Sequence, residues 1–241
     1  MQLLFLDTET TGNDLSRDRL CQVSYQSEAG IKTGLFRPPL PISVKAMSIT
    51  HITNDAVANQ PTFKDSPMFQ ELEQLLTDHI LVAHNASFDV AMLAAEGLQI
   101  PTYICTLRLV SYLDEDGEIP EYNLQYLRYF FNLNIPEAHA HDAEGDVRVL
   151  AALFKLLQVK LLTRLPNEDE ALAQMIQISQ QPFLRRTFKF GKYRGLKIAD
   201  IAQKDPGYLE WLLQQKMAEG NLKDPDTETW IYSLKHHLGR H

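Results

Sequence analysis

Residues 3–12 read LLFLDTETTG, a short apolar run that ends in two carboxylates. Side chains alternate faces along a β-strand, so Asp7 and Glu9 are expected to project to the same side. Like charges this close repel each other unless a cation lies between them, and carboxylate oxygens suit a hard ion such as Mg²⁺. The stretch therefore predicts a strand followed by a tight turn at Gly12. Its two carboxylates either hold a divalent metal or are only the polar exit of the strand, and further carboxylates at suitable spacings decide between the two.

The following segments predict an α/β fold. Leu20–Ser24 and Lys32–Arg37 are separated by a polar turn, which indicates an antiparallel meander with the first strand. Ile80–Ala83 is fully apolar, as is typical of a strand buried in a parallel sheet. Pro61–Asp78 holds a helix with 3.6-residue periodicity, whereas Ser48–Asn54 is polar and is expected to be irregular. We therefore expect a mixed sheet flanked by helices.

A third carboxylate follows the apolar strand in the segment HNASFDV, which starts at residue 84. We expect Asn85 to cap a helix and Asp89 to lie in its first turn. That position is at the carboxyl edge of the sheet, where open α/β folds bind ligands. Taken alone, Asp89 could instead complement the helix dipole, and Phe88 could pack in the core rather than cover a bound base.

A fourth carboxylate, Asp146, lies in an amphipathic helix predicted from Ala143 onward. His141 precedes it by five residues, which corresponds to a rotation of about 140° if both are helical. The two side chains converge only if His141 lies in the loop before the helix, where it could act as a general base. The alternative is a solvated histidine and a surface aspartate. His139 competes for the role, but Glu144 rather than an aspartate follows it at the same spacing.

An aromatic group lies in a helix predicted over Asn123–Phe131. We interpret its members as packing residues without chemistry: Tyr126, Tyr129, Phe130 and Phe131.

Composition bounds the class of protein. With 241 residues, 44% of them hydrophobic, the chain is long enough for one large domain and a small one. No apolar run approaches the roughly 20 residues needed to span a bilayer, and the N-terminus has no basic leader. Cys21 and Cys105 form no disulfide framework or zinc set, which favours a reducing cytoplasm.

Charge is unevenly distributed along the chain. The formal net charge is −8, yet residues 183–241 hold 11 Lys and Arg against 7 Asp and Glu, giving +4, so residues 1–182 carry −12. An acidic body with a basic appendage suggests that the appendage recruits an anionic partner.

The basic appendage begins with a predicted hairpin, in which Thr187–Phe190 and Leu196–Ile198 flank a GKYRG turn. Phe190 or Tyr193 could stack on a base while the cations contact phosphates. Alternatively, the aromatic rings form the core of a small module and the charges are its solvated surface. The possible phosphate contacts are Arg185, Arg186, Lys189, Lys192, Arg194 and Lys197.

Three motifs in one order, DTETTG at 7–12, NASFD at 85–89 and HDAEGD at 141–146, resemble the DEDDh family of 3′→5′ exonucleases. The resemblance covers about residues 1–160 and implies a ribonuclease-H-like fold and two divalent ions, Mg²⁺ or Mn²⁺. The implied metal ligands are Asp7, Glu9, Asp89 and Asp146, with His141 as the base. The implied contacts to the terminal nucleotide are Thr10, Thr11, Gly12, Asn85 and Phe88.

The tail is similar to the C-terminal module of the exodeoxyribonuclease X family. We therefore expect a catalytic domain over 1–162, a helical connector over 163–182 and a hairpin-plus-helices module over 183–241. The resemblance implies hydrolysis of DNA from its 3′ end, single-stranded or frayed, to 5′-mononucleotides, in DNA repair. Two alternatives stay open: an RNA-trimming exonuclease of the same fold, and a noncatalytic nucleic-acid-binding adaptor.

Overall fold

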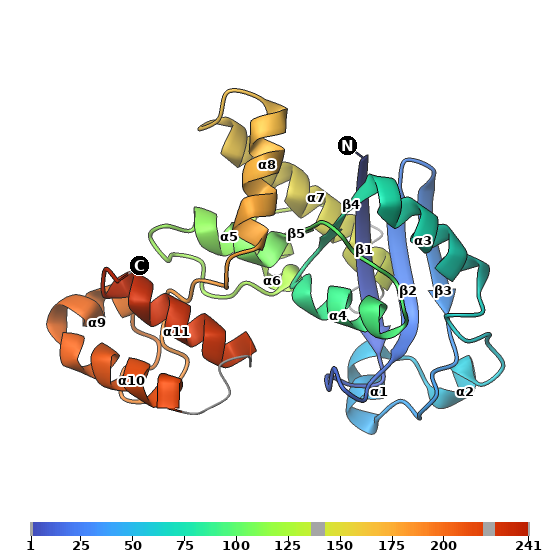
Figure 1. Cartoon of the computed structure of the whole chain (residues 1–241), viewed down its shortest axis with the longest axis horizontal. Coiled ribbons are helices and arrows are strands. Elements are labelled where there is room, and N and C mark those ends of the chain that lie inside the picture. The colour runs from blue at the N-terminus through green and yellow to red at the C-terminus, as the bar shows by residue number, and fades with distance from the viewer. Residues whose placement is uncertain (1, 136–142, 219–224, 241) are drawn as a thin grey trace. The chain divides into compact units, whose positions relative to one another are not determined.

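The computed structural model describes residues 2–135, 143–218 and 225–240 (Figure 1). The chain divides into two compact units, of which the first comprises Met1–Thr106 and Asn123–Ile176. The second comprises Leu107–Tyr122 and Gln177–His241. Leu107–Tyr122 thus belongs with the C-terminal residues, although the predicted boundaries place it in the catalytic domain. The predicted domain boundaries stay a prediction.

The first unit is built on a five-stranded mixed sheet. Its strands are β1 (Gln2–Thr10), β2 (Leu20–Ser27), β3 (Gly30–Leu35), β4 (His79–Ala83) and β5 (Tyr103–Cys105). The order is β3-β2-β1-β4-β5. β1, β2 and β3 pair antiparallel, whereas β4 runs parallel to both β1 and β5. The predicted meander with added parallel strands is confirmed.

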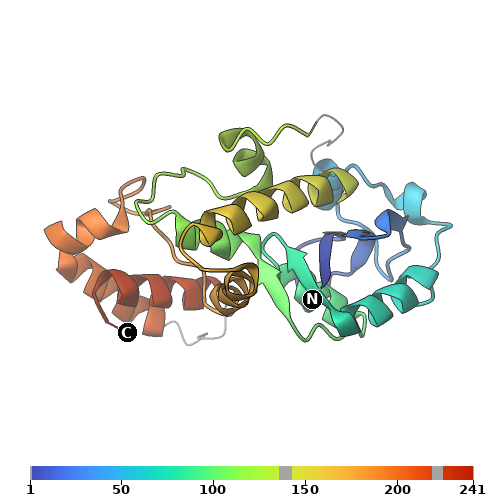
Figure 2. The same cartoon turned by 90° about the horizontal axis from the view of Figure 1, so that it is seen from above.

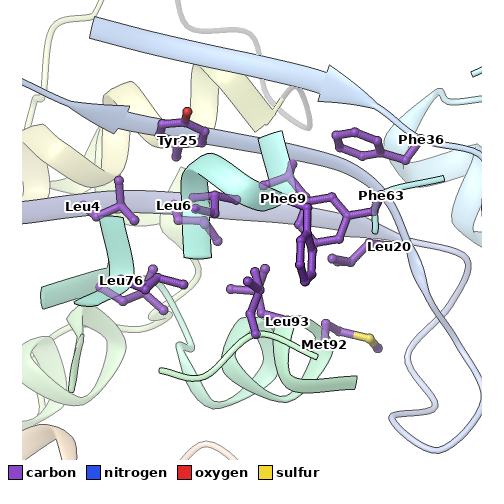
Figure 3. Packing of buried hydrophobic residues seen from close by; sticks show 14 residues of the cluster. Leu4, Leu6, Leu20, Tyr25, Phe36, Phe63, Phe69, Leu76, Met92 and Leu93 are labelled. Carbon is purple, nitrogen blue, oxygen red and sulfur yellow. The ribbon is translucent and has the colours of Figure 1, made fainter. Parts of the chain in front are cut away.

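One face of the sheet packs against α3 (Pro67–Asp78) and α4 (Ser87–Ala95). Leu4 and Leu6 point into this core, where they meet Leu76 of α3 and Leu93 of α4 (Figure 3). These alternate residues of β1 are fully buried. Because side chains alternate along a strand, the residues of β1 at the intervening positions face the opposite side of the sheet.

The opposite face packs against α7 (Ala143–Leu162), which contacts β1, β2 and β3. Phe5 of β1 meets Phe154 of α7 edge to face, with ring centroids 5.4 Å apart. Asp7 and Glu9 follow Phe5 by two and four residues, so their side chains also project to the α7 side of the sheet. The strand therefore delivers two carboxylates beside the start of a helix.

Three further helices lie in the first unit: α1 (Val44–Thr50), α2 (Asn54–Val57) and α6 (Leu124–Phe130). Two others, α5 (Thr106–Leu113) and α8 (Glu168–Ser179), include residues of both units, and most of α5 belongs to the second. The expectation of an irregular Ser48–Asn54 holds only for residues 51–53, which link the two helices. It is wrong for the flanking residues, because Ser43 and Thr53 each accept a hydrogen bond from a backbone N–H and thereby cap α1 and α2. No helix in the described ranges is both long and apolar enough to cross a membrane.

The second unit has its own core, formed by α9 (Ile198–Lys204), α10 (Pro206–Ala218), α11 (Pro225–His237) and the segment before them. Phe188 stacks on Trp230 of α11 at a centroid distance of 6.0 Å, while Trp211 of α10 is 52% exposed. The predicted hairpin is present as a minimal antiparallel pairing, with one bridge between Thr187 and Lys197.

Candidate active site

Three carboxylates from two elements form one cluster. Asp7 and Glu9 come from β1, and Asp146 comes from the first turn of α7. Each offers one oxygen, and these oxygens all lie within 4.8 Å of one another. The structure thus brings together three of the four predicted carboxylate ligands, and a single hard cation could reach all three.

Asp89, the fourth predicted ligand, lies in the first turn of α4 and is buried. It is not one of the three clustered residues, but its charge acts on Asp7. Its Oδ1 accepts a hydrogen bond of 2.8 Å from the Thr8 hydroxyl. Sequence reasoning missed Thr8, although its place between the two carboxylates of β1, facing the opposite side, was a usable signal.

Burial and, for Asp7, repulsion from neighbouring carboxylates disfavour negative charge in this group. Burial raises the pKa of Asp7 well above its ordinary value, and the charges of Asp89, Asp146 and Glu9 raise it further. Burial also raises the pKa of Asp89 to about 7, against the opposing effect of the Thr8 hydrogen bond. A divalent cation would relieve this repulsion, so the donor set fits a hard metal ion.

Gln125 is a second residue that sequence reasoning missed. It lies in the first turn of α6, and its Nε2 donates a hydrogen bond to Oδ1 of Asp146. Its Oε1 is buried without a hydrogen-bond partner among the described residues. Nothing in the residue pattern marks this glutamine, because its role depends on how α6 packs on α7.

The turn after β1 is held by its own hydrogen bonds. Thr10 donates through its hydroxyl to the Gly12 carbonyl at 2.6 Å. The Thr11 amide donates to the Arg19 carbonyl, and the Thr11 carbonyl accepts from the Ser43 amide. The Thr11 amide is therefore already used, and its carbonyl keeps one lone pair that a nucleotide could still donate to.

Gly12 fills a position that requires a glycine, because a Cβ there would collide with the Asp18 carboxylate. That carboxylate is fixed by the Thr11 hydroxyl, which donates to its Oδ1 at 2.8 Å. The backbone at Gly12 is therefore held close to a second segment of the chain, as the sequence predicted for a tight turn.

The segment before α4 differs from expectation. Asn85 is not the N-cap: it has a left-handed φ of 62°, and Ala86 occupies the cap position without a side-chain hydrogen bond. The Asn85 carbonyl accepts from the Phe88 amide at 2.9 Å, so a turn starts the helix. Asn85 is exposed, and Phe88 is partly buried against the core of the sheet. His141 and its competitor His139 lie outside the described residues.

The predicted phosphate contacts of the second unit differ in exposure. Lys189, Lys192 and Arg194 are exposed, whereas the other three are half-buried. Arg186 donates to the Ser111 carbonyl and Lys197 to the Asp116 carbonyl. Arg185 lies over the ring of Trp230. The half-buried cations therefore have contacts within the chain.

Lys192 also has partners. Its ammonium group is 3.0 Å from Asp205, and it lies 4.5 Å and 4.9 Å from the ring centroids of Tyr193 and Tyr208. The Tyr193 hydroxyl donates to the same Asp205 carboxylate. Arg194 is the one residue among the six cations for which the described part of the chain offers no partner.

Comparison with known families gives two matches. Residues 4–154 match the exonuclease family model, and residues 188–216 match the exodeoxyribonuclease X-like C-terminal model. The chain is similar to exodeoxyribonuclease 10 of Escherichia coli strain K12, at 32% identity over 98% of both chains. It is also similar to the DNA polymerase III subunit epsilon of Treponema pallidum, at 32% identity over 61% of this chain and 72% of that one.

Solved structures give a consistent result. A structure of exonuclease X in complex with 5′ overhanging duplex DNA is 28% identical and covers 73% of this chain and 99% of that one, with a TM-score of 0.55. Escherichia coli exonuclease I in complex with a dT13 oligonucleotide is 20% identical, with a TM-score of 0.53, and covers 71% of this chain and 45% of that one. The second likeness concerns the fold alone.

We expect the metal-free protein to lose stability as pH rises. The pKa values of Asp7 and Asp89 are raised above their unfolded values near 4, so the folded state binds more protons between pH 4 and 7. The urea midpoint in EDTA should therefore fall between about pH 5 and pH 8, and Mg²⁺ at pH 8 should raise it. Asp7→Asn should flatten this pH dependence. An Asp7→Asn protein with an unchanged slope would contradict the explanation.

We expect Gln125→Ala to weaken metal binding, because the amide orients Asp146. Loss of a partner that orients a ligand typically costs about 10- to 100-fold in metal affinity. Calorimetric titration with Mg²⁺ measures the effect. Gln70→Ala, at an exposed position of α3, is the matched control and should leave the affinity unchanged. Equal affinities for the two variants would show that the contact with Asp146 is not needed.

Proposed function

The chain belongs to the exonuclease family that its residues 4–154 match, and on this premise we propose that it hydrolyses DNA from the 3′ end and releases 5′-mononucleotides. The observation that carries the proposal is the cluster of Asp7, Glu9 and Asp146, with Asp89 close enough to raise the pKa of Asp7. An adaptor that only bound nucleic acid would have no use for four mutually repelling carboxylates.

The chemistry requires positive charge at the scissile phosphate. Divalent ions, when bound, supply the charge that stabilises both the attacking and the departing oxygen of a phosphodiester. We assign Asp7, Glu9 and Asp146 to one ion, and Asp7 with Asp89 to a second. Mg²⁺, with Mn²⁺ as a substitute, suits these oxygen donors. The number and identity of the ions are part of the proposal.

Other residues of the chain complete the proposed reaction. His141 accepts the proton of the attacking water, as a general base beside Asp146. The backbone at Thr10 and Gly12, together with Asn85 and Phe88, holds the terminal nucleotide. The Thr11 amide donates to Arg19 and its hydroxyl donates to Asp18, so this residue would hold the nucleotide through its carbonyl.

The substrate is proposed to be a DNA 3′ end, single-stranded or frayed from a duplex. This assignment draws on the relative named exodeoxyribonuclease 10 and on the exonuclease X structure that contains duplex DNA with a 5′ overhang. A role in DNA repair and a cytoplasmic location, the latter expected from a sequence whose two cysteines give no disulfide framework, are proposals of the same kind.

The second unit is proposed to bind the DNA backbone through its exposed cations. Lys189 and Arg194 suit this role best, because Lys192 is already held by Asp205 and two tyrosine rings. The aromatic residues around Phe188 form a core, as the alternative interpretation of the tail expected, and Phe190 is left 40% exposed.

A direct assay tests the function. The protein with Mg²⁺ should shorten 5′-labelled DNA of about 30 nucleotides into a ladder from the 3′ end, and EDTA should stop the reaction. Asp7→Asn should lower the rate at least roughly 100-fold, because preorganised charge stabilisation at the transition state is lost. Asp65→Asn, on the surface of the same unit, is the matched control.

A matched RNA strand decides the substrate class. A ladder on RNA alone would assign the chain to RNA trimming, since a site that requires the 2′-hydroxyl distinguishes the two. DNA binding without any ladder, at an affinity that Asp7→Asn leaves unchanged, would overturn the enzymatic function and favour the adaptor.

Salt dependence tests the second unit. Each phosphate contact to single-stranded DNA contributes about 0.7 to the slope of log K against log salt. Lys189→Ala combined with Arg194→Ala should therefore flatten the slope by about 1.4. Lys204→Ala with Lys235→Ala, two exposed lysines on helices of the same unit, is the control. Identical slopes for both double variants would exclude binding of the DNA phosphates at Lys189 and Arg194.

A further inference from the structure

The aromatic residues of α6 are not core residues. Tyr129 is 71% exposed and Phe130 is 43% exposed, whereas Leu127 is fully buried. The interpretation of Tyr129 and Phe130 as packing residues is therefore wrong. The helix buries Leu127 but leaves the large apolar rings of Tyr129 and Phe130 exposed, at positions where an ordinary amphipathic helix carries polar side chains.

Four rings near the end of this helix make up what we call the α6 aromatic face, namely Tyr126, Tyr129, Phe130 and Phe131. Tyr126, Phe130 and Phe131 are in ring contact with one another in sequence. Tyr126 and Phe130 are one turn apart and stack with planes 24° apart and centroids 6.0 Å apart. Phe130 meets Phe131 edge to face at 5.2 Å. Such a surface presents ring faces and edges rather than a pocket, so it suits a flat aromatic ligand.

Cations lie on the α6 aromatic face. The Arg128 guanidinium is 5.4 Å from the ring centroid of Tyr129. The Lys160 ammonium, from the neighbouring α7, is 4.7 Å from the ring centroid of Phe131. A ligand that combines flat rings with negative charges would therefore find both of its partners here.

The α6 aromatic face adjoins the carboxylate cluster within the first unit. Gln125, in the first turn of α6, bonds Asp146, and α6 packs on α7 (Figure 2). Tyr129 follows Gln125 by four residues, which is about 6 Å along a helix axis. The helix that carries the rings therefore begins at the carboxylate cluster, where the proposed function places the 3′ end of the strand.

We propose that the α6 aromatic face is a stacking site for bases of the DNA strand. These bases belong to the nucleotides that lie on the 5′ side of the 3′-terminal nucleotide. The inference rests on the proposed DNA exonuclease function and adds a second binding position to it. Stacking on ring faces tolerates any base, which suits an enzyme that removes nucleotides in succession. Exposed rings beside an arginine suit a protein partner as well as a base. The contact of the same helix with the carboxylate cluster favours the DNA strand, because the proposed reaction brings the strand to that cluster.

The experiment removes single bases from the DNA and then aromatic rings from the protein. DNA strands of about 30 nucleotides carry one abasic nucleotide at successive positions from the 3′ end, and KM is measured for removal of the terminal nucleotide. For the unaltered protein, an abasic nucleotide at one or two positions should raise KM about 5- to 100-fold. Tyr129→Leu combined with Phe130→Leu keeps apolar area but removes the rings. It should raise KM similarly on normal DNA and become insensitive to the abasic nucleotide.

Two further variants control the measurement. Tyr129→Trp keeps a ring at the site and should retain the abasic effect, which separates stacking from a fault in folding. Tyr112→Leu removes a comparably exposed tyrosine, 42% exposed, from α5 in the second unit, and should change nothing.

The outcomes are distinct. A double leucine variant that responds to every abasic position as the unaltered protein does would overturn the stacking site. A change in oligomeric state on gel filtration, with DNA kinetics unchanged, would overturn it in favour of a contact between copies of the chain. If the unaltered protein fails to shorten normal DNA at all, the proposed function fails and this inference with it. Shortening of normal DNA without any abasic effect rejects the stacking site alone.

Discussion

Mutual repulsion among carboxylates at one sheet edge is the constraint on which the rest of the first unit depends. Asp7, Glu9 and Asp146 have oxygens within 4.8 Å of one another, and the buried Asp89 adds its charge to Asp7. Such a group opposes folding unless a cation or protons compensate it. The elements around it act as supports, because β1 fixes two of the carboxylates while Thr8 and Gln125 each orient another.

The prediction of the fold succeeded where it depended on alternation along the chain. The two-residue period of β1 and the unbroken apolar run of β4 specify which faces of the sheet are covered by helices. They do so whichever residues pack on the sheet from elsewhere in the chain. It failed where one local hydrogen bond decides: Ser43 caps a helix that composition did not suggest, and Asn85 adopts a left-handed turn in place of capping. Capping residues and turn residues are the same residue types, so the sequence alone does not separate these outcomes.

The candidate site shows a similar division. Asp7 and Glu9 are marked by their two-residue spacing at a strand end, whereas Asp89 and Asp146 were identified only through the resemblance of three ordered motifs to a known family. Gln125 was not, since a single glutamine in a helix has no distinguishing pattern until α6 is packed on α7. Rings are equally ambiguous: hydrophobicity predicts burial for Tyr129, yet only one side of a seven-residue helix can face a core.

The two tryptophans of the chain, Trp211 and Trp230, both lie in the second unit, one half-exposed on α10 and the other stacked on Phe188. Indole emission is therefore an intrinsic optical label for the helical C-terminal unit and is blind to the sheet. Far-ultraviolet dichroism, by contrast, averages over both units. Denaturation curves from the two spectroscopies would consequently coincide only if the whole chain loses its structure in a single step.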